Sequence, residues 1–331
     1  MVMRRLQSLV LAFGLLGLVA TAASAEDKYP SKPIKIVLAY GAGSATDIIT
    51  RIMCDQLRQV IGQPCVVENK PGAFGIIAVE EMARSKPDGY TLMIGNVSTN
   101  AITPVLFKDR FKIDYQKDVV AVARLADLPT FLMATTRNFP PKTLAEIVAY
   151  AKERPGKLKY ASPGAGSFPH YDMEILAKRA GIAMQAIHIK AGPPGYINDM
   201  TLGDIQLAFM NVATSAPQIK AGTLKPIVTT TEKRLDDYPD VPTMAEAGFP
   251  GVGTMLWAGL FAPAGTPTPV LETLQKAVVE TLKSQPVLES YARQNVRSNP
   301  TATLAEAQSW LNGEIASWQK ITSEIKIDLT D

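Results

Sequence analysis

The chain of 331 residues is long enough for two domains, and its formal net charge is only +3. This small charge excludes a polybasic nucleic-acid binder, so local groups would have to hold any negatively charged ligand. The two Cys and two His are too few and too scattered for a metal cluster. We therefore expect neither nucleic acid nor metal among its ligands.

The N-terminus has the pattern of a secretory signal peptide. Arg4 and Arg5 precede an apolar run over residues 9–19, and Ala23-Ser24-Ala25 follows. A basic start, an apolar run too short to span a bilayer and an A-x-A site predict a signal peptide over residues 1–25. No later run is long and apolar enough for a membrane span. We expect an exported, periplasmic protein that begins at Glu26 and does not span the membrane.

Residues 34–61 predict a strand, a tight turn and a helix. The apolar, β-branched run at 34–40 is typical of a buried strand, and the small residues GAGSATD at 41–47 follow it. Apolar residues then recur with helical spacing up to residue 61. Such a turn places backbone N–H groups at a helix N-terminus, which attracts anions. The pattern therefore favours a site for a negatively charged group.

Two other interpretations of this turn compete with a small-ligand anion site. In a dinucleotide-binding turn, Gly41 and Gly43 would be followed by a third glycine, but Thr46 stands there. Glu68 does end the next apolar run, where such a fold needs an acidic residue. An exported protein would rarely meet a nicotinamide cofactor, so we expect no cofactor. The other interpretation is structural, with Ser44, Thr46 or Asp47 capping the helix.

The following elements predict two α/β domains. Strands at 65–68 and 90–95 flank a second glycine-rich turn and a helix, a βαβαβ series that favours a parallel sheet with ligands at its carboxyl ends. Strand-like runs at 119–125 and 130–134 follow one another without a helix, which indicates a crossing. A strand at 158–162, a glycine-rich turn and a helix repeat the opening pattern. We expect residues 26–124 plus 253–331 in domain 1, residues 125–252 in domain 2, and a ligand cleft that closes by hinge motion.

Short motifs spread over the whole mature chain match a known family. The sequence resembles the periplasmic solute-binding proteins of tripartite tricarboxylate transporters, often called Bug proteins. The resemblance implies a two-lobed Venus flytrap fold with a mainly parallel sheet in each lobe. It also implies a non-catalytic monomer that binds a small organic carboxylate and delivers it to membrane permease subunits. The motifs are YPSKP at 29–33, GSATD at 43–47, GQP at 62–64, VENKPG at 67–72, PDGYTL at 87–92, RPGKLKYA at 154–161, DVPTMAEAG at 240–248 and APAGTP at 262–267.

The same resemblance implies a set of ligand-binding residues in loops of both domains. Its first loop spans residues 40–47, and residues 98 and 99 end the third strand of domain 1. The second-domain loop spans residues 162–170, and residues 190 and 211 follow later. The candidates are Tyr40, Ala42, Gly43, Ser44, Ala45, Thr46, Asp47, Ser98, Thr99, Ser162, Gly164, Gly166, Ser167, Phe168, His170, Lys190 and Asn211.

Several departures from the family pattern leave the ligand open, aliphatic or aromatic. Gly41 and Ala42 replace commoner prolines, and Phe209-Met-Asn211 lacks an acidic residue that members carry. Residues 188–192 are one residue shorter than the usual segment and lack its tyrosine.

The pattern leaves several residues with two interpretations. Tyr40 and Phe168 belong either to the core or to an aromatic wall that stacks on a planar ligand. Lys190 is either solvated or meets a second carboxylate. Ser167, His170 and Asp172 raise the alternative of an exported hydrolase, but the G-x-S-x-G turn is missing, so we favour His170 as a hydrogen-bond donor in the pocket wall. A periplasmic ligand sensor for a signalling membrane protein is a further alternative.

The two cysteines leave a disulfide open. Cys54 lies on the first helix and Cys65 at the start of the next strand, close enough to pair in an oxidising compartment. Against pairing, Cys54 is about 200° from Ile52 around the helix, which turns it away from the apolar face.

The first prediction concerns processing. Mass spectrometry of the exported protein should give a chain that begins at Glu26, because cleavage follows the A-x-A site. A mature chain that keeps residues 1–25 would contradict export and would make a cofactor plausible again.

Overall fold

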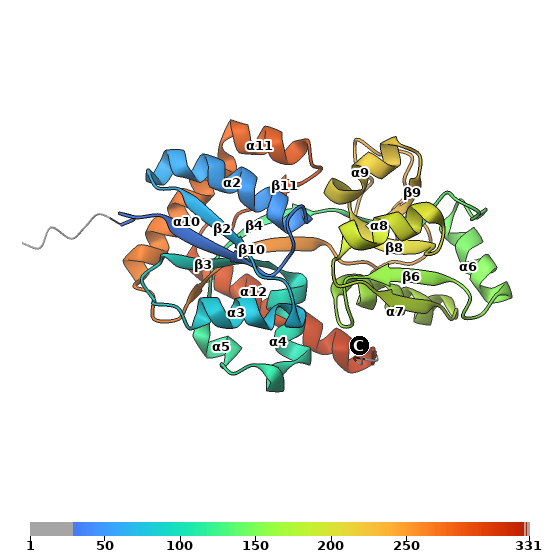
Figure 1. Ribbon diagram of the computed structural model, residues 1–331, viewed down its shortest axis with the longest axis horizontal. Coiled ribbons are helices and arrows are strands. Elements are labelled where there is room, and N and C mark those ends of the chain that lie inside the picture. The colour runs from blue at the N-terminus through green and yellow to red at the C-terminus, as the bar shows by residue number, and fades with distance from the viewer. Residues whose placement is uncertain (1–28, 328, 330–331) are drawn as a thin grey trace, which may run out of the picture.

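The computed structural model describes residues 29–327 and 329, so the predicted signal peptide lies outside the described residues. The chain forms two lobes side by side, each built on its own sheet (Figure 1). In the part of the chain that is described, no helix is long and apolar enough to cross a membrane.

The first lobe contains a six-stranded sheet in the order β11-β4-β10-β3-β1-β2. β1 pairs in parallel with both β2 and β3, whereas β10 is antiparallel to its neighbours β3 and β4. The strands β1 to β4 therefore run in one direction and β10 runs against them. Their bounds are β1 (Ile34–Leu38), β2 (Cys65–Asn69), β3 (Thr91–Asn96), β4 (Val119–Leu128), β10 (Leu256–Pro263) and β11 (Arg297–Ser298).

The helices of the first lobe begin and end where local signals predict. In α2 (Ala45–Ile61), the hydroxyl of Ser44 accepts the Asp47 amide at one end, and Gly62 ends the helix in the left-handed region with φ of 71°. The longer helices are α3 (Ile76–Ala83), α10 (Thr268–Lys283), α11 (Gln285–Ala292) and α12 (Leu304–Glu324); the short turns are η1 (Ala73–Gly75), η2 (Ser98–Ile102), α4 (Thr103–Leu106), η3 (Lys108–Arg110) and α5 (Tyr115–Asp118).

The second lobe contains a five-stranded sheet in the order β7-β6-β8-β5-β9. β6 is parallel to β7 and β8, and β5 is antiparallel to β8 and β9. The bounds are β5 (Thr130–Thr135), β6 (Lys159–Ser162), β7 (Gln185–His188), β8 (Leu207–Asn211) and β9 (Leu224–Thr229), with helices α6 (Leu144–Glu153), α7 (Phe168–Ala180), α8 (Pro193–Leu202) and α9 (Val212–Lys220).

Both sheets are mixed, which corrects the expectation of a mainly parallel pairing in each lobe. In each sheet, the strand that arrives from the other lobe runs against its neighbours: β5 follows β4 directly, and β10 returns from the second lobe. The short strand β11 is also antiparallel to β4. The predicted two-lobed α/β fold is confirmed. Because β4 stays paired with β10 up to Leu128, we now propose the first domain boundary at Pro129 rather than at residue 125. The return boundary at residue 253 stays a prediction.

A buried carboxylate ties the second lobe to the returning segment. Asp172 on α7 accepts hydrogen bonds from the Thr254 amide at 2.8 Å and the Thr254 hydroxyl at 2.7 Å. Burial raises the pKa of Asp172 to about 7, although both hydrogen bonds from Thr254 oppose the rise. Since Thr254 lies just before β10, this contact fixes one side of the passage between the lobes.

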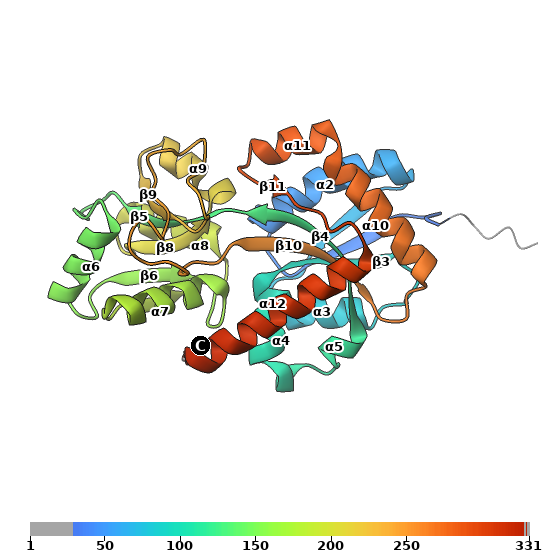
Figure 2. The ribbon, with the colours of Figure 1, turned by 180° about the vertical axis from the view of Figure 1, so that it is seen from behind.

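The C-terminal helix α12 belongs to the first lobe but reaches the second (Figure 2). Its Trp318 ring packs edge-on against Tyr171 of α7, with ring centroids 5.5 Å apart. Near its end, the Glu324 carbonyl accepts a hydrogen bond of 3.2 Å from the Lys178 ammonium. Opening the lobes would have to change these contacts.

Cys54 is buried, which corrects the expectation that it faces away from the core. α10 and α11 both pack against α2, so this helix is covered on more than one side. Both cysteines are free thiols in the structure. A hydrogen bond with Cys65 and burial together raise the pKa of Cys54. The two thiols therefore lie next to each other, and the disulfide stays a prediction.

We expect Cys54 and Cys65 to bond on oxidation. A bridge that closes a loop of about ten residues should stabilise the protein by roughly 3 kcal/mol, because it restricts the unfolded chain. Thermal unfolding with and without dithiothreitol should therefore differ, and the denatured, oxidised protein should have no titratable thiol. The Cys54→Ser variant is the control and should be insensitive to the reductant. Two titratable thiols after oxidation would contradict the bridge.

Candidate functional site

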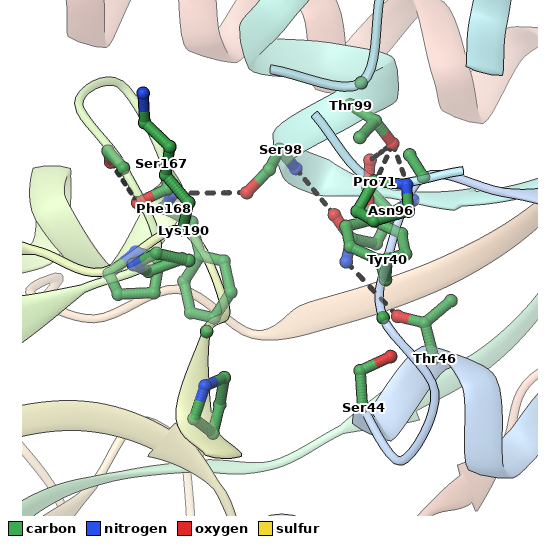
Figure 3. Close-up of a pocket in the computed structure, with 18 of the residues that line it drawn as sticks. Tyr40, Ser44, Thr46, Pro71, Asn96, Ser98, Thr99, Ser167, Phe168 and Lys190 are labelled. Atoms are coloured by element: carbon green, nitrogen blue, oxygen red, sulfur yellow. Dashed lines mark hydrogen bonds between the residues drawn. The ribbon is translucent and has the colours of Figure 1, made fainter. Parts of the chain in front are cut away.

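A cavity of about 430 Å³ lies between the lobes (Figure 3). The first lobe lines it mainly with the loops after β1, β2 and β3, and the second lobe with the loops after β6 and β7 and the end of β8. Loops at the carboxyl ends of parallel strands meet at one edge of a sheet, which is where ligands bind in open α/β sheets. The cavity therefore lies where the sequence predicts a ligand.

The N-terminus of α2 opens into this cavity. The first four amides of a helix have no partner inside it; here Ser44 accepts the Asp47 amide with its hydroxyl and the Ile48 amide with its carbonyl. Among the described residues, no acceptor is found for the amides of Ala45 and Thr46, which both line the cavity, so these amides can donate to a ligand. The Thr46 hydroxyl accepts a hydrogen bond of 3.3 Å from the Asn96 side chain, which turns this polar pair toward the same space. This terminus offers amides and hydroxyls to an anion.

Polar side chains after β3 extend this wall. The hydroxyls of Tyr40 and Thr99 are hydrogen-bonded at 2.7 Å, and the Asn96 side chain accepts the Ser98 amide at 2.9 Å. All four residues line the cavity. The hydrogen bond to Thr99 therefore fixes the orientation of the Tyr40 ring at the cavity.

Neither Asp47 nor Gly43 lines the cavity, which differs from their expected role; Asp47 is buried and braces the loop, whereas Gly43 is exposed. The Asp47 carboxylate accepts the Gly43 amide at 3.0 Å, Arg51 Nε at 3.0 Å and Asn69 Nδ2 at 2.9 Å. Burial opposes ionisation of Asp47, but the hydrogen bonds from Arg51, Asn69 and Gly43 outweigh it and hold its pKa below the ordinary value. Its charge is thus used to fix the loop.

The second-lobe loop is braced in a similar way. The His188 Nδ1 and the Ser162 hydroxyl are 2.7 Å apart, and the Gly166 amide donates to His170 Nδ1 at 3.2 Å. The two imidazole rings meet edge-on with centroids 4.7 Å apart. Neither Ser162 nor His170 is among the residues that line the cavity, and the donor role expected of His170 stays a prediction. The ring supports the loop from behind.

The residues of the hydrolase alternative have other partners. The Ser167 hydroxyl donates to the Gly164 carbonyl at 2.7 Å, and Asp172 binds Thr254. His170 accepts the Gly166 amide. These hydrogen bonds tie Ser167 and His170 to their own loop, and Asp172 to the segment that returns to the first lobe.

The lobes touch across the cavity. The Phe168 amide, first in α7, donates to the Ser98 hydroxyl at 3.2 Å (Figure 3). Gly166 lies so close to the first lobe that an added Cβ would come within 3.0 Å of Leu106. The structure thus has the two ligand loops in direct contact.

Thirteen of the predicted site residues line the cavity. They are Tyr40, Ala42, Ser44, Ala45, Thr46, Ser98, Thr99, Gly164, Gly166, Ser167, Phe168, Lys190 and Asn211. Phe168 is both a lining residue and part of the core, whereas Lys190 is exposed at the rim. Asn211 directs its side-chain amide to the Thr130 hydroxyl at 3.2 Å and so also holds the crossing strands.

Sequence reasoning missed the loop after β2 and the start of α8. For the loop after β2, the glycine-rich turn at 69–75 was a usable signal, since it follows a strand just as the turn at 41–47 does. The proline pair that begins α8 gave no such signal. The missed residues include Pro71, Phe74, Asn96, Pro193, Pro194 and Met210.

Two α/β lobes joined by two crossings, with a cavity lined from both, define a periplasmic-binding-protein fold. A family model described as "Tripartite tricarboxylate transporter family receptor" matches residues 49–327. The chain belongs to this family, as its motifs predicted.

Curated relatives and solved structures agree with this membership. A "UPF0065 protein in gbd 5'region" of Cupriavidus necator is 35% identical over 286 residues, which cover 85% of this chain and 84% of the relative. BugT of Bordetella pertussis is 29% identical over 298 residues, which cover 90% of each chain. The structure of the periplasmic binding protein BugD matches with a TM-score of 0.83 and 28% identity, covering 91% of this chain and 99% of BugD.

Two structural neighbours were solved with carboxylates. An R. palustris protein with adipate matches with a TM-score of 0.83 and 29% identity, covering 89% of this chain and 97% of the neighbour. MatC from Rhodopseudomonas palustris, with bound malate, matches with a TM-score of 0.81 and 28% identity, covering 88% and 99%.

Replacing Asp47 with Ala should loosen the first ligand loop. The change leaves Arg51, Asn69 and the Gly43 amide without their shared acceptor, so we expect a loss of about 1–3 kcal/mol in the free energy of unfolding. Asp47 has a lowered pKa in the folded protein, so its stabilisation is present above the ordinary aspartate pKa and is lost as the pH falls through the lowered one.

Urea unfolding of Asp47→Ala and of the parent protein, near neutral pH and in strong acid, measures the difference in their free energies of unfolding. This difference should be smaller in acid. Asp55→Ala, an exposed change on the same helix, is the matched control and should alter stability little. Equal stabilities of the two variants at neutral pH would contradict a bracing role for Asp47.

Proposed function

We propose that this protein is an extracytoplasmic solute-binding protein that captures a small organic carboxylate between its lobes. It then delivers the carboxylate to the membrane permease subunits of a tripartite tricarboxylate transporter. The observation that carries this proposal is the N-terminus of α2, where the Ala45 and Thr46 amides and the Ser44 and Thr46 hydroxyls meet the cavity. Amides and hydroxyls at a helix N-terminus suit a carboxylate.

Membership of a receptor family supports the transport role, and neighbours solved with adipate and malate support a carboxylate ligand. The signal-peptide pattern at residues 1–25 supports a periplasmic location. We further propose that the protein acts as a monomer and that the captured ligand holds the lobes together. A permease can then recognise the closed form.

The carboxylate's charge is met mainly by neutral groups in this mechanism. Among the described residues that line the cavity, Lys190 is the one with a charged side chain, and it is exposed. In Figure 3 its side chain extends away from Ser44 and Thr46. Arg51 is engaged by Asp47 behind the wall. Hydrogen bonds in a closed, poorly hydrated cavity gain strength from the low local dielectric constant, so neutral donors suffice.

A thermal-shift screen over mono-, di- and tricarboxylates tests this proposal. A ligand at 100 times its dissociation constant should stabilise the protein by about 2.7 kcal/mol. Ser44→Gly should lower the affinity for the tightest-binding carboxylate by about tenfold, because a hydrogen bond to a charged group is lost. Glycine is itself a tolerable N-cap, so the fold should be retained.

Thr143→Gly makes the same N-cap change at α6, far from the cavity, and should leave binding intact. Calorimetry on both variants measures the dissociation constants. If no carboxylate shifts the unfolding midpoint, the proposed function is wrong. If both variants bind as the parent does, the carboxylate is not held at α2.

A further inference from the structure

The helix N-termini that the two lobes turn toward the cavity are chemically unequal. We infer that the preferred ligand is a monocarboxylate with an apolar body, held by its carboxylate at α2 and by its body against Phe74 and the start of α8. This inference rests on the proposed function and names the class of ligand for the same cavity.

The second lobe does not repeat the donor arrangement of α2. At α7 the first amide, that of Phe168, is taken by Ser98, and the second position is Pro169. At α9 the first amide, that of Val212, donates to the Pro129 carbonyl at 3.0 Å. At both helices the first amide is therefore already engaged.

α8 differs even more from α2. Its first two positions are Pro193 and Pro194, which have no N–H group. The third residue of the helix is Gly195, and its amide donates to the Gly192 carbonyl at 2.8 Å. The Gly192 amide in turn donates to the Ile189 carbonyl at 2.8 Å. A carboxylate at this end would lose its hydration and gain no amide from these first positions. An apolar group would instead pack on two rigid rings.

Phe74 provides the facing apolar surface from the first lobe. Its ring stacks on Phe107 with centroids 4.3 Å apart, and Arg110 lies over Phe107 at 4.7 Å. The Phe74 carbonyl accepts a hydrogen bond of 2.9 Å from the Thr103 hydroxyl. These contacts hold the ring at the cavity and near Gly164, where an added Cβ would lie 4.0 Å from it.

The backbone at Phe74 is strained to hold this position. Phe74 has φ of 57° and Ala73 has φ of 46°, the left-handed region that favours glycine. Such strain persists only where the surroundings enforce it, often at ligand sites. The chain thus keeps a large aromatic ring at the cavity where a glycine would fit more easily.

The remaining lining residues add polar groups around the terminus of α2 and apolar groups elsewhere, beside polar residues of the second lobe such as Ser167 and Asn211. Ser44, Thr46 and Asn96 gather around the terminus of α2. Pro163, Met210 and Leu256 join Phe74 and the proline pair in the rest of the lining. A ligand with one charged end and a hydrocarbon body matches this division, whereas a compact hydroxy-acid with charges at both ends does not.

Calorimetry on the full mature chain with benzoate, hexanoate, malate and citrate tests the inference. We expect the wild-type protein to bind benzoate or hexanoate at least about tenfold more tightly than malate and citrate, since burial of an apolar body supplies the difference. Phe74→Ala should lower the affinity for benzoate and hexanoate by about tenfold or more, and should change the affinity for malate little. Phe74→Leu keeps an apolar side chain and should recover most of the affinity.

Phe111→Ala is the matched control for Phe74→Ala. Phe111 is a partly buried phenylalanine of the same lobe that lies outside the cavity lining, so its loss should leave the order of the four ligands unchanged. Circular dichroism and thermal unfolding of each variant confirm folding.

A gain-of-function variant tests the role of α8 directly. Replacing both Pro193 and Pro194 with Ala returns two N–H groups to this helix N-terminus, so malate should bind about tenfold more tightly. Benzoate affinity should change much less. An unchanged malate affinity would show that the missing donors do not set selectivity and would overturn the inference.

The remaining outcomes separate this inference from the proposed function. If malate or citrate binds more tightly than both apolar ligands, the inference is overturned while the proposed function stands. If Phe74→Ala leaves the affinities for benzoate and hexanoate unchanged, the inference is also overturned. If none of the four carboxylates binds, both the inference and the proposed function fail.

Discussion

Two passages of the chain between the lobes determine where the ligand cavity forms. β4 leads directly into β5 of the other sheet, and the chain returns through Thr254 into β10. Each entering strand runs against its new neighbours, so the parallel strands of both sheets end on the side that faces the other lobe. Loops and helix N-termini follow those ends. The position of amides and hydroxyls at the cavity is therefore a consequence of topology.

The charged and titratable side chains close to the cavity mainly hold its walls. Asp47 fixes the first loop, His170 supports the second, and Asp172 ties α7 to the returning segment. Asp172 has an additional consequence because burial raises its pKa to about 7. The folded state then binds more protons than the unfolded state between the ordinary aspartate pKa and about 7, so this group's contribution to stability falls as the pH rises through that window. The cavity lining itself is mostly neutral.

Much of the fold followed from local patterns. The strand, turn and helix at 34–61 and the repeat of this pattern at 158–180 are visible because β-branched runs, glycines and helical spacing are local signals. The pairing of β4 with β10 depends on residues far apart in sequence, so the mixed sheets were not predictable from alternation or propensity. Burial of Cys54 likewise depends on α10 and α11, which pack on the helix from the other end of the chain.

The site was predictable to a similar extent and for similar reasons. Small residues such as Ser44 and Gly164 mark turns, and turns after strands mark ligand loops. The sequence does not reveal that the carboxylate of Asp47 turns inward to the Gly43 amide, because a capping residue can face either way. Phe74 was missed since a phenylalanine with positive φ is rarely expected in a turn.

The packing of α12 across both lobes gives the protein a natural optical label. Trp257 and Trp310 pack against each other inside the first lobe, with ring centroids 4.5 Å apart. Trp318 instead packs against Tyr171 of the second lobe, so the environment of its indole depends on the relative position of the two lobes. Movement of the lobes apart would expose this indole to water and shift its emission to longer wavelength. The native fluorescence of the unlabelled chain therefore reports its conformational state.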